Sequence, residues 1–513
     1  MRFVFALLLV VCAALPASAR SENRRHVVLI VWDGMRPDFI SERDTPTLAA
    51  LARRGVTFRN HHCVYLSSTE VNGTAISTGC YPERSGIVGN MEYRPEIDPL
   101  KPVHTEGLEI VRRGDETSHG RYIRFPTIAE IVRKNGGRAV VAGAKPVALL
   151  ADRAPRSEES LGVNVFAGTS LPPNLMSMLT DRHGPFPKDT ALDSTRIDWV
   201  TSAMIDSLWV NGLPDFSFVW MNEPDLSQHL TGPGSERSLQ GMRNADNNLA
   251  RILRAVEASG ALENTDIMIV SDHGASTIRT RVDVADLLTK AGVPATREFK
   301  AKPERGEILV ASNGGSTLVY VIGHDEGVIR RVVGFFQQAE FCGVIFCRDP
   351  LPGTFPLHEA RIDSENAPDV FLSMRWTAEK NKNGIAGGID SDASTYGPGQ
   401  GSHVTLSPFD MQATLVAAGP HFRKGVANTL ATGNVDVAPT VLWILGIDPP
   451  KTMDGRILTE ALTIKGPKLR SFEPGQIEAS TKEGGSTWTQ YLKFTEVNGV
   501  RYLDEGNGEQ NPK

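Results

Sequence analysis

Continuous apolar runs, rather than alternating ones, are the main strand signal in this sequence. Residues 26–32 (HVVLIVW), 138–143, 216–221 and 265–271 are mainly apolar, and polar residues follow each of them. A strand that is covered on both faces has this pattern, which is typical of a parallel sheet between two layers of helices. Further strands are predicted at residues 316–322, 370–375 and 411–419.

Segments with helical spacing of apolar residues lie between these strands. Residues 45–55 carry a complete set of helix signals, with Thr45 as cap, Pro46 at the first helical position and Gly55 at the end. Other helices are predicted at residues 127–134, 193–208, 244–259 and 436–446. Strands that alternate with helices predict an α/β fold, with a mostly parallel, doubly wound sheet and helices on both faces.

The pattern is less regular in several places, which suggests how the chain is organised. Residues 281–380 alternate helix and strand less clearly and are expected to form an inserted α/β cap subdomain. The polar segment 464–513 is expected to be a C-terminal tail with one hairpin near residues 487–502. The catalytic core would then comprise residues 20–280, with surface insertions at about 91–125 and 150–190, and residues 381–463.

Residues 1–19 have the features of a signal peptide. Arg2 is followed by a short apolar run and by the small residues of Ala17-Ser18-Ala19. The run is too short for a membrane-spanning helix, and no later stretch is apolar enough to be one. We therefore expect an exported protein, periplasmic or secreted, after cleavage near Ala19.

Composition and cysteine content narrow the class of protein. A net charge of -6 provides no basic surface for a nucleic-acid backbone, so duplex binding is not expected.

Four cysteines follow the signal peptide, and in an oxidising compartment they permit two disulfides. The sequence leaves their three possible pairings open, and no C-x-x-C pair supports a cysteine-rich metal site. The cysteines are Cys63, Cys80, Cys342 and Cys347.

A hydroxyl-rich stretch at residues 67–79 is the first candidate for chemistry. Thr69 would lie at the start of a short helix that ends at Gly79. The free amide groups and the dipole of a helix N-terminus favour an anion such as phosphate. Hydroxyl residues before helices are also common as simple caps, so the stretch alone is a weak signal.

Carboxylate and histidine side chains follow three of the predicted strands. Asp33, Asp225 and the pair Asp272-His273 come after the apolar runs, and His229 lies four residues beyond Asp225. Sites in such sheets form beyond the carboxyl ends of the strands, so these side chains are expected to converge. Asp oxygen and His nitrogen are ligands that zinc accepts, although other divalent metals are compatible.

Together these motifs resemble the alkaline phosphatase superfamily, and within it the nucleotide pyrophosphatase/phosphodiesterase (type I phosphodiesterase) branch. The resemblance runs in order from about residue 26 to residue 455. It is carried by Asp33-Gly34, Thr69, Thr78-Gly79-x-Tyr81-Pro82-Glu83, residues 86–90, Pro224-Asp225-x-x-x-His229, Asp272-His273-Gly274 and Gly401-x-His403.

The resemblance implies a role for each matching residue. One zinc ion would be held by Asp33, Asp272, His273 and the Thr69 oxygen, and a second by Asp225, His229 and His403. Thr69 would be the nucleophile that forms a phospho-threonine intermediate, and Asn90 would donate a hydrogen bond to a phosphoryl oxygen. Two metals of this kind can stabilise both ends of an in-line displacement.

Two features of the sequence bear on the reaction class. Cys80 to Arg84 match the C-x-P-x-R signature of sulfatases, but Thr69 occupies the nucleophile position, so we interpret Cys80 as a coincidental match. Lys145 follows a strand where related monoesterases carry Lys-x-Arg, but Val147 replaces the arginine. A monoester carries one more negative charge than a diester, and one lysine leaves this preference open.

Two further positions bear on the leaving group. Glu70 follows the nucleophile, where nucleotide-cleaving relatives typically have an aromatic residue that stacks on a base. Trp220 matches the other aromatic side of that pocket, but tryptophan is also often a core residue.

The sequence thus predicts a metal-dependent hydrolase of small-molecule phosphate esters. A phosphodiesterase or nucleotide pyrophosphatase is the leading hypothesis. A phosphate monoesterase that uses Lys145, a phosphonate or sulfate ester hydrolase, and an inactive binding relative are the alternatives.

Overall fold

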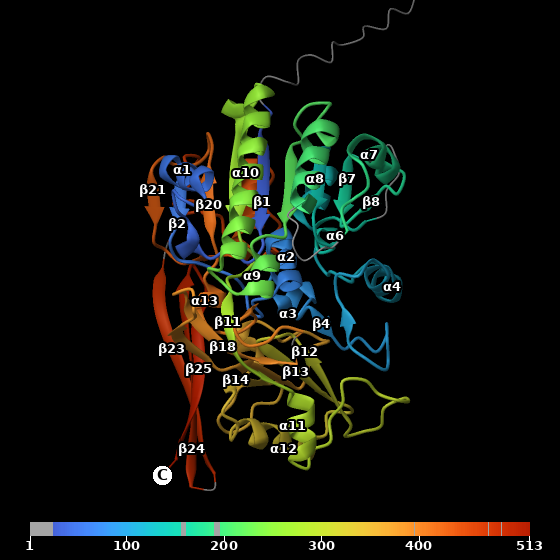
Figure 1. The fold of residues 1–513 in the computed structure, drawn as a ribbon, viewed down its shortest axis with the longest axis vertical. Helices are drawn as coiled ribbons and strands as arrows, with labels where there is room; N and C mark the ends of the chain where they lie inside the picture. The colour runs from blue at the N-terminus through green and yellow to red at the C-terminus, as the bar shows by residue number, and fades with distance from the viewer. Residues whose placement is uncertain are drawn as a thin grey trace, which may run out of the picture.

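The computed structural model describes residues 24–154, 161–188, 195–393, 395–469, 471–483 and 485–512. The predicted signal peptide lies outside these residues. The molecule is elongated, with the N-terminal α/β layers at one end and the later β-sheets at the other (Figure 1).

The main sheet contains nine strands of the described chain, in the order β21-β2-β20-β10-β1-β9-β6-β7-β8. Its five central strands, β10, β1, β9, β6 and β7, run parallel, whereas β20 and β8 are antiparallel to their neighbours on the inner side. The sheet is therefore mixed at its edges. It is parallel at the strands whose ends the predicted site residues follow. The strands are β21 (Val426–Asn428), β2 (Val56–Phe58), β20 (Leu415–Ala418), β10 (Thr265–Val270), β1 (His26–Trp32), β9 (Phe216–Met221), β6 (Ala139–Gly143), β7 (Gly162–Phe166) and β8 (Thr169–Leu171).

Strand β1 shows why its sequence is apolar without alternation. Val27, Leu29 and Val31 pack into one hydrophobic core, and the intervening residues pack into a second core on the other face. The first face is covered by α2 (Thr69–Thr78), α5 (Ile128–Lys134), α6 (Ala148–Ala151) and α14 (Val437–Ile444). The second is covered by α1 (Pro46–Arg54), α7 (Leu175–His183), α8 (Thr195–Ala203) and α10 (Glu236–Ala258).

Two smaller sheets lie below the main sheet in Figure 1. One has the strand order β17-β18-β11-β19 and the other β12-β13-β16-β14-β15. Helices α11 (Val284–Lys290) and α12 (Glu326–Phe336) pack against the second sheet through a separate hydrophobic core. The strands are β17 (Trp376–Lys380), β18 (Ala386–Asp392), β11 (Ser276–Val282), β19 (Gly401–Ser402), β12 (Ile308–Ser312), β13 (Ser316–Val321), β16 (Val370–Met374), β14 (Cys342–Cys347) and β15 (Phe355–Pro356).

The C-terminal segment is more ordered than the predicted polar tail. Its described residues form three long antiparallel strands, β23 (Phe472–Glu483), β24 (Ser486–Val497) and β25 (Val500–Pro512). The predicted hairpin corresponds to β24 and β25, and β23 was missed. The side chain of Gln490 on β24 bonds both the N–H and the carbonyl of Ile345, so this sheet is attached to β14.

Several segments differ from the prediction because tertiary packing orders polar sequence. Residues 91–125, expected to be irregular, contain β4 (Met91–Glu92), β5 (Val103–His104) and α4 (Leu108–Ser118). Residues 150–190, expected to be a surface insertion, contribute β7 and β8 to the main sheet. Helix α10 begins well before residue 244, because Ser235 caps it through the Ser238 N–H.

The remaining short elements complete the structure. They are β3 (His61–His62), α3 (Pro82–Ser85), α9 (Asp225–Thr231), α13 (Pro408–Met411) and β22 (Thr432–Gly433). All four cysteines after the predicted signal peptide are described, and each is a buried free thiol. Cys342 and Cys347 stand at opposite ends of β14, which explains why they do not form a local disulfide.

Candidate active site

The ends of three neighbouring parallel strands bring the predicted carboxylates together. Asp33 directly follows β1, Asp272 lies two residues beyond β10, and Asp225 begins α9 shortly after β9. The Asp33 N–H donates to Met221 O, and the Asp225 N–H donates to Asp33 O at 3.0 Å. Because β10, β1 and β9 are adjacent in the sheet, residues far apart in sequence meet at one edge.

Thr69 is the first residue of α2 and is held in place by Asn72, one turn further on. The Asn72 amide donates to the carbonyls of Val64, Leu66 and Ser68, and its Oδ1 accepts from the Val64 N–H. This one side chain fastens the loop before Thr69 to the helix. As a result Thr69 Oγ1 lies 3.3 Å from His273 Nε2.

Three histidines of the site have the same arrangement of ring nitrogens. Their Nδ1 atoms lie within hydrogen-bond distance of backbone carbonyls: His229 to Gly401, His273 to Gly274 and His403 to Ser67, at 2.9, 2.7 and 2.8 Å. A carbonyl accepts, so each Nδ1 carries the proton and each Nε2 offers a lone pair. Metal-binding histidines usually have this type of support.

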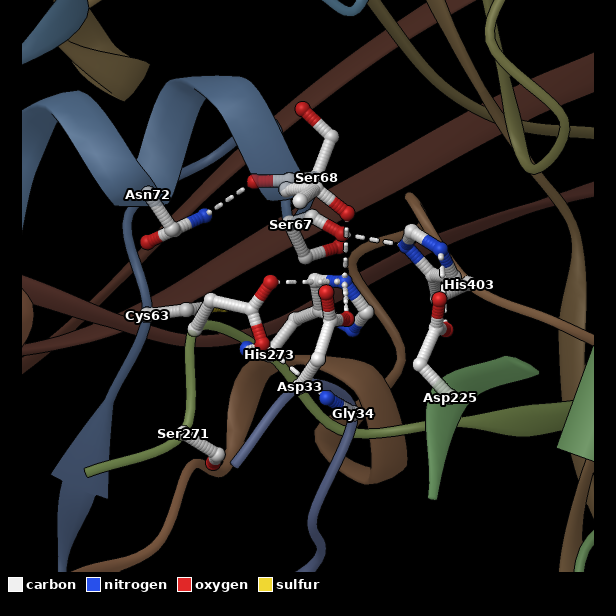
Figure 2. A network of polar contacts seen from close by, with 12 residues as sticks. Asp33, Gly34, Cys63, Ser67, Ser68, Asn72, Asp225, Ser271, His273 and His403 are labelled. Atoms are coloured by element: carbon white, nitrogen blue, oxygen red, sulfur yellow. Dashed lines mark hydrogen bonds and ion pairs between the residues drawn. The ribbon is translucent and has the colours of Figure 1, made fainter. Parts of the chain in front are cut away.

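The Nε2 atoms and the carboxylate oxygens point into two shared spaces. In one, Asp225 Oδ1 lies 3.2 Å from His229 Nε2 and 3.7 Å from His403 Nε2. In the other, His273 Nε2 lies 3.2 Å from Asp272 Oδ2 and 3.6 Å from Asp33 Oδ1. Figure 2 shows Asp33, His273, His403 and Asp225 directed toward one another beside Ser67 and Ser68.

The donor atoms fit divalent metal ions. Asp33 Oδ1 and Asp272 Oδ2 are buried and have no hydrogen-bond partner among the described residues, which is costly unless a cation satisfies them. Ligand atoms of Asp225, His229 and His403 lie within 4.8 Å of one another, as do those of Asp33, Asp225 and His273. Asp225 thus belongs to both groups. Asp272 is in neither group, but its Oδ2 lies 3.2 Å from His273 Nε2, a ligand atom of the second group.

The electrostatics of the cluster also favour a cation. Burial, together with Asp225 and Asp272, raises the pKa of Asp33 well above its usual value. Burial raises the pKa of Asp272 to about 7 and lowers the pKa of His273 and His403. Several buried carboxyl groups repel one another here, and neutral imidazoles stand beside them as ligands.

Metal affinity is therefore expected to fall as the pH decreases through about 7, where the buried Asp272 carboxyl takes up its proton. A ligand must lose its proton to bind the metal. For each proton that is displaced, the apparent metal affinity therefore falls by up to about tenfold for every unit by which the pH decreases. Competition with a chromophoric chelator at pH 6, 7 and 8 measures the apparent zinc affinity. A zinc affinity that is the same at all three values would contradict this charge assignment.

The structure places Trp220 in the core beside the site. Its ring is 1% exposed, and its indole N–H donates to Asp33 Oδ2 at 2.8 Å. Gly73 of α2 lies directly against the ring, where a Cβ atom would come within 3.1 Å of it. Trp220 therefore orients Asp33, a candidate metal ligand, through its indole N–H. Its ring has no exposed face on which a base could stack.

Lys145 reaches the centre of the site from the end of β6. Its Nζ lies 2.7 Å from Asp33 Oδ2 and 3.0 Å from Asp225 Oδ2. Burial opposes its charge, but Asp225 and Asp33 raise its pKa well above the usual value. The lysine is thus a partly exposed cation of the site that is paired with two buried aspartates.

Glu70 and Asn90 lie beside Thr69. Glu70 is 3% exposed, and its N–H donates to Asn90 Oδ1 at 3.2 Å. The N–H groups of Asn90 and Met91 both donate to Asn313 Oδ1 and so fix this segment. With Oδ1 engaged, the donor group of the Asn90 side chain is its Nδ2.

Cys80 lies at the opposite end of α2 from Thr69. Its Sγ faces the carbonyls of Thr78 and Thr452, and burial raises its pKa to about 12. A buried neutral thiol in this place does not share the site with the predicted ligands.

Sequence reasoning missed several residues that support the site. Asn434 donates to Asp272 O and to Asn72 Oδ1, and the carbonyls of Ser67, Gly274 and Gly401 orient the histidines. A supporting carbonyl leaves no signal in sequence, because every residue has one.

Comparison with known proteins decides the family. The sequence model of type I phosphodiesterase / nucleotide pyrophosphatase matches residues 27–332. The chain belongs to this family. It is accordingly a phosphoester hydrolase, and the Asp and His groups described above are its candidate metal ligands.

Relatives of this phosphodiesterase family match over most of the chain at low identity. Human ectonucleotide pyrophosphatase/phosphodiesterase family member 7 is 23% identical over 458 residues, which cover 88% of this chain and 86% of the relative. Mouse bis(5'-adenosyl)-triphosphatase enpp4 is 20% identical over 438 residues, which cover 82% of this chain and 78% of the relative.

Solved structures of the family share the fold. Murine ectonucleotide pyrophosphatase/phosphodiesterase 5 superimposes with a TM-score of 0.60 at 14% identity, covering 86% of this chain and all of that one. The described part of the chain contains no helix that is long and apolar enough to cross a membrane.

Proposed function

We propose that the protein is an exported phosphodiesterase that cleaves small phosphate diesters through a phospho-threonine at Thr69 and uses two zinc ions. One observation supports this most strongly. The Nε2 atoms of three carbonyl-anchored histidines and the oxygens of three aspartates converge beside the Thr69 hydroxyl. Asp33, Asp272, His273 and Thr69 would hold one ion, and Asp225, His229 and His403 the other.

The residues around the phosphoryl group each have a defined part in this proposal. Thr69 Oγ attacks phosphorus, the leaving alkoxide departs opposite to it, and water later cleaves the Thr69 ester from the vacated side. Asn90 Nδ2 and the N-terminal N–H groups of α2 bind the phosphoryl oxygens. Zinc ions, when bound, supply positive charge that lowers the pKa of the hydroxyl and stabilises the leaving oxygen.

The surroundings of Thr69 bear on the proposed leaving group. A mouse relative is described as a bis(5'-adenosyl)-triphosphatase, which is consistent with nucleotide substrates. In this chain Glu70 replaces an aromatic neighbour, and Trp220 is fully covered. We therefore place a simple diester before a nucleotide, and keep a phosphate monoester as the second candidate because Lys145 lies in the site.

The arrangement of the chain supports two further parts of the proposal. We infer that residues 281–380, which hold the five-stranded sheet and α11 and α12, act as an inserted cap subdomain beside the core. The apolar N-terminal segment supports export before the protein acts.

A substrate panel tests the proposal. Zinc-loaded protein is assayed with bis-p-nitrophenyl phosphate, p-nitrophenyl phosphate, a nucleotide diester and p-nitrophenyl sulfate. We expect kcat/KM to be highest for the simple diester, because it carries one negative charge and needs no stacking surface. A large preference for the monoester would overturn the diesterase assignment, and turnover of the sulfate alone would place the protein among sulfate ester hydrolases.

A further inference from the structure

The two groups of candidate metal ligands meet at a pair of histidine rings. His273 belongs to one group and His403 to the other. Their rings stack with centroids 3.6 Å apart and planes inclined by 14°. The rings come from different segments, because His273 lies in the loop after β10 and His403 follows β19. The separation of the two groups therefore depends on what joins these two segments.

Asp410, on the short helix α13, contacts both segments through its side chain. Its Oδ1 accepts from the Ser276 hydroxyl at 2.6 Å, three residues beyond His273. Its Oδ2 accepts from the Thr405 hydroxyl at 2.5 Å and from the Thr405 N–H at 3.1 Å, two residues beyond His403. The carboxyl group is fully buried, so water does not compete for these hydrogen bonds.

The backbone of α13 adds to the contact on the His273 side. The Gly274 N–H donates to Asp410 O at 2.8 Å, and the Ala275 N–H donates to Phe409 O at 3.1 Å. A Cβ atom on Gly274 would come within 2.0 Å of Phe409 O, so the close approach of α13 requires a glycine here. Three consecutive residues after His273 are thus hydrogen-bonded to α13.

The His403 side extends the same network to the loop before Thr69. Ser67 Oγ donates to Thr405 O at 2.9 Å, and Ser67 O accepts from His403 Nδ1 at 2.8 Å. Ser67 lies two residues before Thr69. Asp410 therefore stands in the middle of a network that includes one candidate ligand of each metal group and the loop of the candidate nucleophile.

We propose that Asp410 is a positioning residue that sets the distance between the two metal groups by holding the His273 and His403 segments together. The inference rests on the proposed function, because it concerns the two ions of that site. Asp410 is not itself a candidate ligand and acts only through the segments that carry the histidines.

The spacing of the two groups matters for the proposed reaction. Two-metal hydrolases hold their ions about 3.5–4 Å apart, so that one ion acts on the nucleophile and the other on the leaving oxygen. A displacement of about 1 Å can lower a rate by about 10²-fold. A residue that fixes two ligand segments relative to each other therefore affects kcat without touching the substrate.

A purely structural role for Asp410 predicts a different result. Removing a buried carboxylate that only stabilises the fold lowers the melting temperature and leaves metal binding unchanged. Asp246, which is bonded to the N–H groups at the start of α1, is a carboxylate of that kind. Asp246→Ala is therefore the matched control for Asp410→Ala.

Four variants of the network test the inference. Asp410→Ala removes both side-chain links, whereas Asp410→Asn keeps them, because an amide oxygen can accept from Thr405 and an amide N–H can donate to Ser276 Oγ. Ser276→Ala removes only the link on the His273 side. Thr405→Val removes only the hydroxyl link on the His403 side. Thermal melting shows whether each variant is folded, and the two single-link variants decide by the same criteria if Asp410→Ala is not.

Three readouts are used for each variant. Competition with a chromophoric chelator measures the stepwise zinc affinities, and crystal structures of the zinc-loaded proteins measure the separation of the ions. Steady-state kinetics with bis-p-nitrophenyl phosphate give kcat and KM separately. The first two readouts do not depend on turnover. Two zinc ions with a spacing that depends on Asp410, but no hydrolysis of the diester, would contradict the proposed function and support this inference.

Asp410→Ala is expected to weaken binding of the second zinc ion by about tenfold and to change the separation of the ions. It should lower kcat by about 10²-fold with little change in KM, because the substrate contacts remain while the spacing is lost. Asp410→Asn should restore most of the loss. Each single-link variant should lose less, and adding it to Asp410→Ala should cause no further loss, since its link is already broken.

Two results would overturn the role of Asp410. The first is unchanged zinc affinity, ion separation and kcat in Asp410→Ala while its melting temperature falls as in Asp246→Ala. The second is an asparagine variant as impaired as the alanine variant, because the negative charge and not the bridge would then be required. Binding of only one zinc ion by the unaltered protein would overturn the two-ion assignment together with this inference.

Discussion

Replacing Thr69 by alanine is expected to lower kcat for bis-p-nitrophenyl phosphate by at least about 10³-fold, because the covalent step loses its nucleophile. The hydroxyl lies 3.3 Å from His273 Nε2 and is the only part of Thr69 that the substitution removes apart from a methyl group. The fold should persist, since alanine is compatible with the first turn of α2. Steady-state kinetics together with elemental analysis of zinc measure both effects.

Three variants serve as controls for this result. Thr69→Ser keeps a hydroxyl and should retain measurable turnover. Ser68→Ala removes the neighbouring hydroxyl, which is buried and makes no hydrogen bond among the described residues, and should leave kcat close to that of the unaltered protein. Activity that survives in Thr69→Ala but is lost in Cys80→Ala would show that the nucleophile is at the other end of α2.

Replacing Asp225 by asparagine is expected to have the largest effect on metal binding. Asp225 contributes to both groups of candidate ligands, and its Oδ1 lies close to both His229 and His403. Losing its charge should weaken zinc binding by about 100-fold or more and reduce activity accordingly. Zinc stoichiometry after dialysis against a weak chelator, followed by chelator competition, measures this change.

A buried carboxylate outside the site provides the matched control for Asp225→Asn. Asp246 is 2% exposed and accepts hydrogen bonds from the N–H groups of Thr47 and Leu48 at the start of α1. Asp246→Asn should lower the melting temperature but leave the zinc stoichiometry unchanged. If both variants keep their zinc, Asp225 is not a metal ligand and the two-ion assignment is wrong.

The convergence of the candidate metal ligands could be predicted from sequence because parallel sheets place the ends of their strands together. Asp33 and Asp272 each follow a continuous apolar run, and those two runs form adjacent strands of the sheet. The order of the motifs along the chain also indicated the family, and the family comparison confirmed it. These signals are local in sequence, so they do not depend on how distant segments pack.

The prediction was weaker where a side chain has two plausible environments. Trp220 could have been either a stacking surface or a core residue, and only the packing of α2 over its ring decided between them. Lys145 could have been solvated, but the folded chain places it between two buried aspartates. The number of C-terminal strands was underestimated for a similar reason. Their half-buried faces are stabilised by contacts with β14 that the sequence does not display.

The stretch that begins at Thr69 illustrates the division between sequence and structure. By itself the sequence determined an α/β protein, a helix that starts at the candidate nucleophile, and a set of candidate Asp and His ligands at strand ends, because periodicity and motif order are properties of the chain. Only the tertiary structure decided that Asn72 fixes the Thr69 loop and that backbone carbonyls orient the three histidines. Only it paired Lys145 with Asp33 and Asp225, because contacts between segments distant in sequence form when the chain folds.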